Sequence, residues 1–164
     1  MSTELDARLD ALEQRLRLVE DELAVTRLVL GYGPRVDSGS AEATAALWAE
    51  DGSYEFEAGA AALRGRAGLA AMVRSDAHRA HLHRGCAHVL TAPHVVVTGD
   101  TALATCYSLM HHYVAETGIF QVSRVSANRW ELVRTGDGWC VANRTNRLLN
   151  GDDAARALFA STIG

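Results

Sequence analysis

The sequence predicts an α+β fold, in which a curved antiparallel sheet wraps around three N-terminal helices and leaves a cone-shaped cavity. Helical periodicity fills the first part of the chain, and strands separated by turn signals fill the second part. The 164 residues are 48% hydrophobic and 22% charged, which suits one globular domain with one core. A cavity between a curled sheet and its helices is the expected place for a small ligand.

The composition argues against several kinds of partner. The formal net charge is −4, and the 16 basic residues form no patch dense enough for nucleic acid or an anionic membrane. No apolar run approaches the roughly 20 residues that span a bilayer, and the charged N-terminus does not resemble a signal peptide. Cys86, Cys106 and Cys140 form no CxxC pair, so we expect free thiols in a reducing cytoplasm.

Residues 4–30 are predicted to form one long helix. Its apolar residues recur at alternating spacings of four and three, at Leu5, Leu9, Leu12, Leu16, Val19 and Leu23. This seam fits an amphipathic helix that covers the domain's own sheet. It also fits a helical extension over residues 1–20 that packs on a neighbouring subunit. Gly31, Gly33 and Pro34 are expected to end or kink the helix.

Two further helices and a short strand are predicted before the main sheet. Ser40 is expected to cap a helix over about residues 41–50, and residues 53–57 alternate as a strand does. Residues 65–75 are predicted to be a third helix. Residues 76–87 are polar and unpatterned, and are predicted to be a loop.

Four long strands are predicted to follow, with turn signals between them. They cover residues 87–98, 101–115, 119–134 and 139–149. Gly99-Asp100 and the similar glycine-containing turns after it mark hairpins, so the four strands are expected to form an antiparallel meander. A short helix is expected over residues 152–160.

Four short motifs carry a family resemblance over residues 15–150. They are Tyr32-x4-Asp37 after the first helix, Leu47-Trp-Ala-Glu-Asp51 before the first strand, His88 five residues before Pro93, and the Gly138-Trp139 turn. In this order and spacing the chain resembles the SnoaL-like members of the nuclear transport factor 2-like superfamily. Within them it is most similar to the branch of scytalone dehydratase, bile acid 7α-dehydratase and hexachlorocyclohexane dehydrochlorinase.

The resemblance implies one domain over residues 1–164, folded as a cone-shaped α+β barrel with a deep apolar pocket. It implies an active site without a cofactor, built on an Asp–His dyad whose members would be Asp37 and His88. It also implies a homo-oligomer, with a trimer favoured over a dimer. Because a fold hosts many functions, the residues themselves must carry the functional argument.

His88 and Asp37 are suited to acid–base chemistry. A neutral imidazole can accept a proton near pH 7, because its ordinary pKa is about 6.5. A carboxylate on its other nitrogen fixes the tautomer and stabilises the imidazolium that forms. The alternatives are a strand-end histidine without a partner, and an aspartate that serves the Ser38-Gly39 turn.

Two further residues are predicted to assist this pair. The phenol of Tyr32 could polarise a substrate carbonyl or hydroxyl, with a satisfied core tyrosine as the alternative. His111 and His112 are neighbours on one strand, so only one of them faces the pocket. The spacing from His88 to His111 matches a carboxylate in bile acid 7α-dehydratase, and scytalone dehydratase uses a second histidine in this part of its sheet. We therefore predict His111 as the second catalytic group.

The predicted substrate-binding residues come mainly from the strands. They are Trp48, Tyr54, Phe56, Tyr107, Leu109, Asn128 and Arg147. Arg147 best matches an arginine near the pocket of bile acid 7α-dehydratase, with an exposed sheet-face arginine as the alternative. Ordinary core packing explains the aromatic and aliphatic members equally well.

The sequence matches no standard motif for binding a metal or a cofactor. The group His78-x2-His81-x-His83, with Cys86 and His88, matches none of the standard zinc patterns, so no metal is expected. The sequence carries no GxSxG motif, P-loop or dinucleotide-binding GxGxxG. No cofactor is predicted.

Together these features predict a cofactor-independent dehydratase, a lyase that performs β-elimination. Its substrate would be an apolar cyclic molecule such as a steroid, terpenoid or polyketide. His88 would remove a proton next to a carbonyl, Asp37 would orient His88, and Tyr32 and His111 would assist the oxyanion or the leaving hydroxyl. The first alternative is a double-bond isomerase or polyketide cyclase that uses the same dyad. The second is a non-catalytic domain that binds a small molecule.

Overall fold

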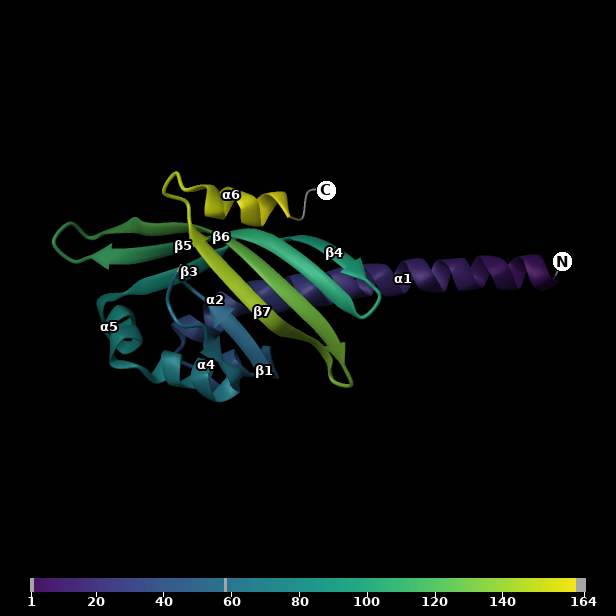
Figure 1. The fold of residues 1–164 in the computed structure, drawn as a ribbon, viewed down its shortest axis with the longest axis horizontal. Helices are drawn as coiled ribbons and strands as arrows, with labels where there is room; N and C mark the ends of the chain where they lie inside the picture. The colour runs from purple at the N-terminus through teal and green to yellow at the C-terminus, as the bar shows by residue number, and fades with distance from the viewer. Residues whose placement is uncertain (1, 58, 162–164) are drawn as a thin grey trace.

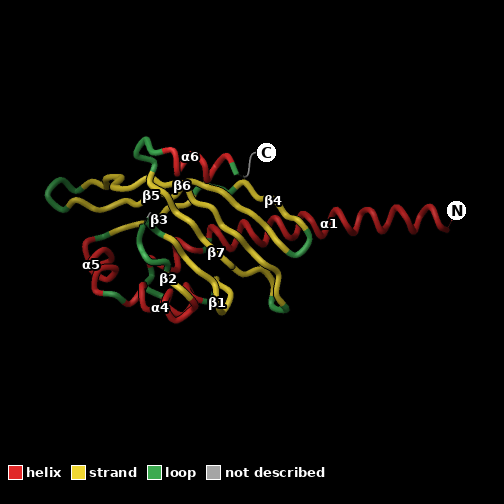
Figure 2. The backbone as a smooth tube through the Cα atoms, in the orientation of Figure 1, coloured by secondary structure: helices red, strands yellow, loops and turns green. Residues whose placement is uncertain are grey.

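A curved, unclosed sheet forms the frame of the molecule, and helices lie against it (Figure 1). The computed structural model describes residues 2–57 and 59–161. Seven strands follow the order β2-β1-β7-β6-β5-β3, and β4 also pairs with β5. Figure 2 shows the long strands crossing the middle of the molecule, with the N-terminal helices behind and below them. The predicted α+β class is confirmed.

The central strands form the predicted meander. They are β5 (Thr101–Val114), β6 (Ile119–Thr135) and β7 (Gly138–Leu148). Each pairs antiparallel with the next. The turn glycines Gly99, Gly118 and Gly138 have positive φ, which glycine adopts without a steric penalty. The hairpin signals in the sequence therefore mark real turns.

The strand predicted over residues 87–98 is two strands. β3 (Cys86–Leu90) and β4 (His94–Thr98) both pair antiparallel with β5. Pro93 lies between them, and proline has no backbone N–H to continue a ladder. The interruption separates β3, which contacts α2 (Tyr32–Asp37) and α5 (Asp76–Arg84), from β4, which contacts α1 (Ser2–Leu30).

The sheet also contains one parallel pairing, contrary to the prediction of an antiparallel sheet. β1 (Trp48–Glu55) runs parallel to β7, and antiparallel to the short β2 (Leu63–Arg64). Strands joined by a long connection are free to pair in parallel, whereas a hairpin forces an antiparallel pair. The helix predicted over residues 41–50 is only α3 (Ala41–Ala45), because Trp48 already belongs to β1.

The first helix ends at Gly31, one of the three residues expected to end or kink it, whereas Gly33 and Pro34 lie within the next helix. α1 (Ser2–Leu30) ends before Gly31, and α2 (Tyr32–Asp37) follows at once. Ser40 occupies the N-cap position of α3, but its side chain makes no capping hydrogen bond. The Ser40 hydroxyl instead pairs with that of Ser38.

The loop predicted over residues 76–87 is wrong, since most of it is a helix. α4 (Gly65–Arg74) is followed by α5 (Asp76–Arg84), whose N-cap is Ser75. The Ser75 hydroxyl accepts a hydrogen bond from the backbone N–H of His78, as an N-cap does. Its polar composition hid the helix, because only one face of α5 touches the domain. The predicted C-terminal helix is present as α6 (Asp153–Ala160), capped by Asp152.

The core is unusually aromatic around the end of α1. The Trp48 ring contacts those of Tyr32, Tyr54 and Trp130, and Tyr32 also contacts Trp130, at centroid distances of 5.8–6.1 Å. Trp48 and Trp130 are fully buried. Such rings bury large areas and hold fixed relative orientations. They anchor α2 and β1 against the middle of the sheet, where the functional site lies.

The first half of α1 extends away from the domain (Figure 1). Residues 3–20 are exposed, whereas Val25 and Val29 are fully buried. The interpretation that the apolar seam covers the domain's own sheet is therefore wrong for this half of the helix. Within the described residues, no helix combines the length and apolar character needed to cross a membrane.

Candidate active site

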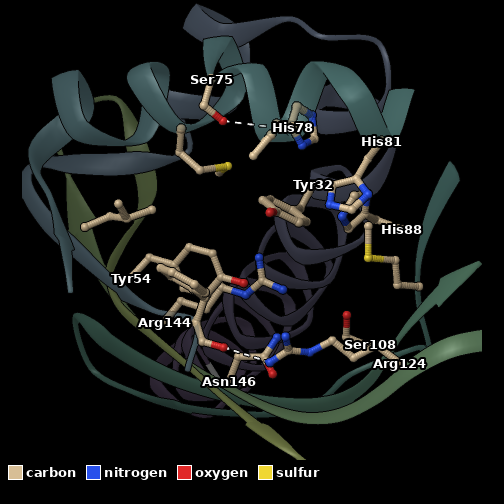
Figure 3. A pocket seen from close by; sticks show the side chains of 15 residues that line it. Tyr32, Tyr54, Ser75, His78, His81, His88, Ser108, Arg124, Arg144 and Asn146 are labelled. Carbon is tan, nitrogen blue, oxygen red and sulfur yellow. Dashed lines mark hydrogen bonds between the residues drawn. The ribbon is translucent and has the colours of Figure 1, made fainter. Parts of the chain in front are cut away.

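A cavity of about 360 Å³ opens between the helices and the sheet (Figure 3). Its apolar lining includes Phe56, Leu63, Met72 and Met110. Its polar lining comes from seven elements, since α2, α5, β1, β3, β5, β6 and β7 each contribute at least one side chain. A mostly apolar pocket with a few convergent polar groups is typical of a small-molecule site.

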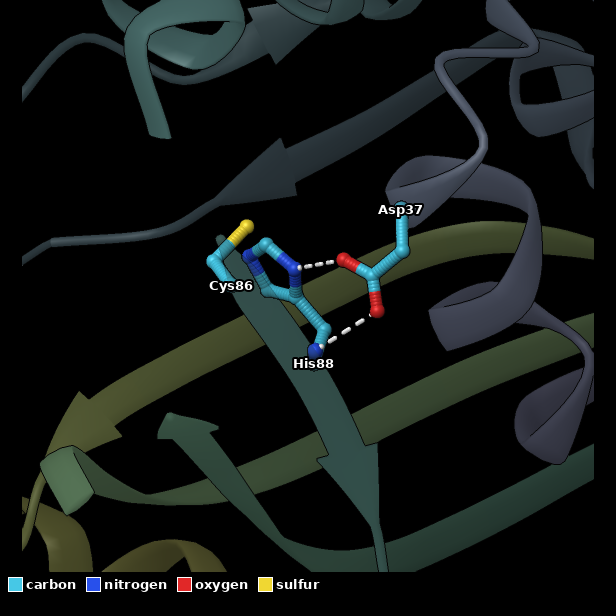
Figure 4. Close-up of side chains that lie close together, drawn as sticks. All are labelled: Asp37, Cys86 and His88. Atoms are coloured by element: carbon cyan, nitrogen blue, oxygen red, sulfur yellow. Dashed lines mark hydrogen bonds and ion pairs between the residues drawn. The ribbon is translucent and has the colours of Figure 1, made fainter. Parts of the chain in front are cut away.

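Asp37 and His88 meet at this cavity (Figure 4). Asp37 Oδ1 lies 2.6 Å from His88 Nδ1, and Asp37 Oδ2 accepts the His88 backbone N–H at 2.8 Å. The carboxylate thus holds both the ring and the strand of His88. With Nδ1 bound to the carboxylate, Nε2 is the ring nitrogen left to act on a ligand.

A close approach between α2 and β3 makes this contact possible. A Cβ atom on Gly33 would lie 2.2 Å from the His88 carbonyl oxygen, so only glycine fits there. Asp37 lies one turn further along α2, at its last residue. The glycine that interrupts the helical pattern in the sequence is therefore what lets the two catalytic candidates reach each other.

A buried arginine forms the floor of the pocket. Arg144 of β7 is 1% exposed, and its guanidinium lies 4.1 Å above the Tyr32 ring and 4.4 Å above the Tyr54 ring. Its Nε and Nη2 both donate to Asn128 Oδ1, at 2.9 Å and 2.7 Å. Nη1 has no partner among the described residues. Burial of a charge is costly unless it is paired, so Nη1 is a ready donor for a ligand oxygen.

Tyr32 lies between Arg144 and the dyad. Burial raises the pKa of Tyr32, and the nearby Tyr54 raises it further, while Arg144 acts in the opposite sense. The phenol therefore stays protonated at neutral pH and can donate a hydrogen bond. Tyr32 and Arg144, both hydrogen-bond donors, therefore line the same cavity as His88.

Histidines of α5 make up one wall of the cavity. His78 and His81 both line it, and His78 Nε2 lies 3.0 Å from the Val36 carbonyl oxygen. His112 Nε2 lies 3.1 Å from His81 Nδ1, with the two rings stacked. Burial lowers the pKa of His81, and the neighbouring His112 and Arg84 lower it further. His81 is therefore neutral near pH 7.

Residues 17–145 match the SnoaL-like domain family. The chain belongs to the SnoaL-like family. It is similar in structure to an NTF2-like protein with a cystatin-like fold from Novosphingobium aromaticivorans, with 48% identity, coverage of 92% of this chain and 96% of the other, and a TM-score of 0.88. This similarity confirms the predicted membership of the nuclear transport factor 2-like superfamily.

Two more distant structures share the fold of this SnoaL-like chain. A function-unknown protein from Mycobacterium tuberculosis is 23% identical, with coverage of 90% and 94% and a TM-score of 0.70. A protein from Catenulispora acidiphila, solved in complex with S-DNPA, is 20% identical, with coverage of 80% and 96% and a TM-score of 0.68. Among curated proteins, none matches this sequence.

The prediction that His111 rather than His112 faces the pocket is wrong. Ser108 and Met110 of β5 line the cavity, and His112 shares their face of the strand. His111 points the other way, where its buried Nδ1 has no partner among the described residues. Even His112 does not line the cavity itself, since it lies behind His81.

The predicted substrate-binding residues divide into three groups. Tyr54 and Phe56 line the cavity of the SnoaL-like domain, whereas Trp48 and Asn128 are buried behind it. Tyr107 and Leu109 lie on the other face of β5, where Tyr107 packs on Phe159 of α6. Arg147 also faces away and pairs with Glu55 at 2.9 Å. The pocket arginine on β7 is therefore Arg144 rather than Arg147.

Several lining residues escaped the sequence-based prediction. They are Leu63, Met72, Ser75, Ala77, His78, His81, Ser108, Arg124, Arg144 and Asn146. Strand alternation was an available signal, because Arg144 and Asn146 are two residues apart and share a face of β7. No comparable signal existed for α5, since the stretch was not predicted to be helical.

One group of potential metal ligands lies at the dyad. The ligand atoms of Asp37, Cys86 and His88 are within 4.8 Å of one another (Figure 4). Both oxygens of Asp37 already accept hydrogen bonds from His88. Burial raises the pKa of the Cys86 thiol, and Asp37 raises it further, whereas a metal binds the thiolate. The group therefore suits a base and its carboxylate partner better than a metal centre.

Proposed function

We propose that this SnoaL-like chain is a cofactor-independent dehydratase acting on an apolar cyclic molecule that carries a hydroxyl group β to a carbonyl. The observation that carries the proposal is the Asp37–His88 contact of 2.6 Å at the edge of a largely apolar cavity. A base held by a carboxylate beside an apolar pocket is suited to removing a proton from carbon.

The first step is proton abstraction. His88 Nε2 takes the proton from the carbon next to the substrate carbonyl, and Asp37 stabilises the imidazolium that forms. The electron pair of the broken C–H bond moves onto the carbonyl oxygen as an enolate. Arg144, whose Nη1 has no partner among the described residues, and Tyr32 both line the cavity, and they would donate to this oxygen as its negative charge develops.

The second step expels the hydroxyl group. The enolate re-forms the carbonyl, the new C=C bond forms and the C–O bond to the β-hydroxyl breaks. The departing oxygen takes a proton from the His88 imidazolium and leaves as water, which restores the neutral base. His81, neutral near pH 7, donates a hydrogen bond to the departing oxygen rather than a full proton. One histidine thus serves as base and then as acid.

The cavity supports a compact, largely apolar substrate with polar groups at defined points. A cavity of about 360 Å³ suits a compact polycyclic substrate better than a long chain. Asn146 lines the same cavity and its Oδ1 has no partner among the described residues, so it could accept a substrate hydroxyl. The fold relative solved in complex with S-DNPA is consistent with a small-molecule ligand for this site.

Isomerisation or cyclisation with the same dyad is the second candidate. One observation favours it: the lowered pKa of His81 leaves no strong acid opposite His88 to assist a leaving group. In that case the His88 imidazolium would return its proton to a different carbon of the substrate. The product would then have the same mass as the substrate.

A panel of hydroxylated ketosteroids and aromatic polyketides tests the proposal by mass spectrometry. Loss of one water supports dehydration, and a product of unchanged mass supports isomerisation or cyclisation. His88→Ala and Arg144→Met should each lower kcat by about 10²–10⁴-fold, whereas His83→Ala, on the exposed side of α5, should not. Substrate binding without turnover by the wild-type chain would support a binding domain and overturn the proposal.

A further inference from the structure

The exposed half of α1 carries an uncovered apolar seam. Leu5, Leu9, Leu12, Leu16, Val19 and Leu23 are each 45–59% exposed. Their four–three spacing puts them on one line along the helix, as the a and d positions of heptads. With Leu9, Leu16 and Leu23 at a, the other three occupy d. A long helix that projects from its domain with such a seam gains little stability from its own chain.

The seam points away from the domain that carries it. Asp21, at an f position, binds Arg134 at 2.6 Å and Trp139 Nε1 at 3.0 Å. Val25, at a c position, is fully buried against the domain. On a helical wheel, c and f lie opposite the line between a and d. The domain therefore holds one face of α1 and leaves the opposite face open.

We propose that this seam binds the same seam of another copy of the chain, in a parallel and in-register coiled coil. The occupant is selected by charge. In a parallel pair, each g residue meets the e residue of the partner five positions later. Here this brings Arg8 to Glu13 and Arg15 to Glu20 of the other copy, so both contacts join opposite charges.

In the next heptad the g and e residues also carry opposite charges, but here the acidic residue is at g and the basic residue is at e. Glu22 at g meets Arg27 at e of the other copy, and both side chains are exposed. An antiparallel pair with aligned seams would instead set Glu13 against Glu13 and Arg15 against Arg15, which repels. The charges therefore favour the parallel arrangement. Because Asp21 and Val25 contact the domain from the f and c positions, the seam over residues 5–23 stays open for the second copy.

Light scattering on the full chain tests the association. The wild-type chain should have the mass of two or more copies at micromolar concentration. Leu12→Glu with Leu16→Glu puts charges in the seam and should raise the dissociation constant at least about 100-fold. Leu18→Glu, at an exposed leucine off the seam, should leave the mass unchanged. A monomeric wild type, or a seam variant of unchanged mass, overturns the proposal.

Disulfide cross-linking tests the direction of the helices. Leu5→Cys puts a thiol at a d position, where two copies face each other only in a parallel and in-register pair. Mild oxidation should join two Leu5→Cys chains rapidly, whereas Leu18→Cys should join them at least about 10-fold more slowly. Circular dichroism checks that both variants keep the helix. Equal cross-linking rates would contradict the parallel arrangement.

Discussion

Asp37 holds β3 through two hydrogen bonds whose contributions can be measured separately. Oδ1 pairs with the His88 ring at 2.6 Å, and Oδ2 accepts the His88 backbone N–H at 2.8 Å. The side chains of His88 and Asp37 are only 16% and 23% exposed, respectively, so solvent screens their interaction weakly. A hydrogen bond to a charged group contributes about 1.5–3 kcal/mol, so we expect Asp37→Ala to lower the free energy of unfolding by about 3–6 kcal/mol.

The His88→Ala background separates the two bonds. It removes the ring and keeps the backbone N–H, so Asp37→Ala should then cost only about 1.5–3 kcal/mol. Urea unfolding at pH 7 of the wild type, Asp37→Ala, His88→Ala and the double variant measures the cost of Asp37→Ala in each background. Asp51→Ala, at an exposed carboxylate of β1, is the control and should change stability by less than about 0.5 kcal/mol. Equal costs in both backgrounds, or no cost with His88→Ala, would refute the reasoning.

Two further predictions concern positions next to the site and on α1. Gly33→Ala should destabilise the fold by about 1–3 kcal/mol and lower turnover, because its Cβ would push against the His88 carbonyl; thermal unfolding and activity check this, and full stability would contradict it. Arg134 lowers the pKa of Asp21, and its bond to Trp139 lowers it further. The stability that Asp21 contributes is therefore present above its ordinary pKa of 3.8 and is lost as pH falls through the lowered value. Urea unfolding from pH 7 to pH 2 should show Asp21→Asn less stable than wild type, with a gap that closes only in acid; a constant gap would argue against the ion pair.

Patterns with a single local cause were predicted well. The hairpin glycines and the helix break at Gly31 depend on residues within one turn of each other, so short stretches of sequence are enough to identify them. The helix α5 was missed because its residues are mostly polar, and the cap at Ser75 shows in sequence only when a helix is already suspected. The parallel pairing of β1 with β7 joins distant parts of the chain and has no local signal.

Some residues of the candidate site were also predicted from the sequence, whereas others depended on the packing of whole elements. The family resemblance brought Asp37 and His88 forward, and their contact is present. Alternation along β7 narrows the pocket side to one of two faces, but it does not say which. That choice depends on which face the helices cover, which is how Arg144 came to line the cavity while Arg147 pairs with Glu55 outside it.

From the sequence by itself come the α+β class, the hairpins between the long strands, and the seam of α1. Periodicity and turn residues are properties of neighbouring positions, and they survive any arrangement of the elements. Only the tertiary structure decided that His81 rather than His111 lines the cavity, and that the seam of α1 is uncovered. Both outcomes depend on how whole elements pack, because a side chain's surroundings are set by residues far away in the sequence.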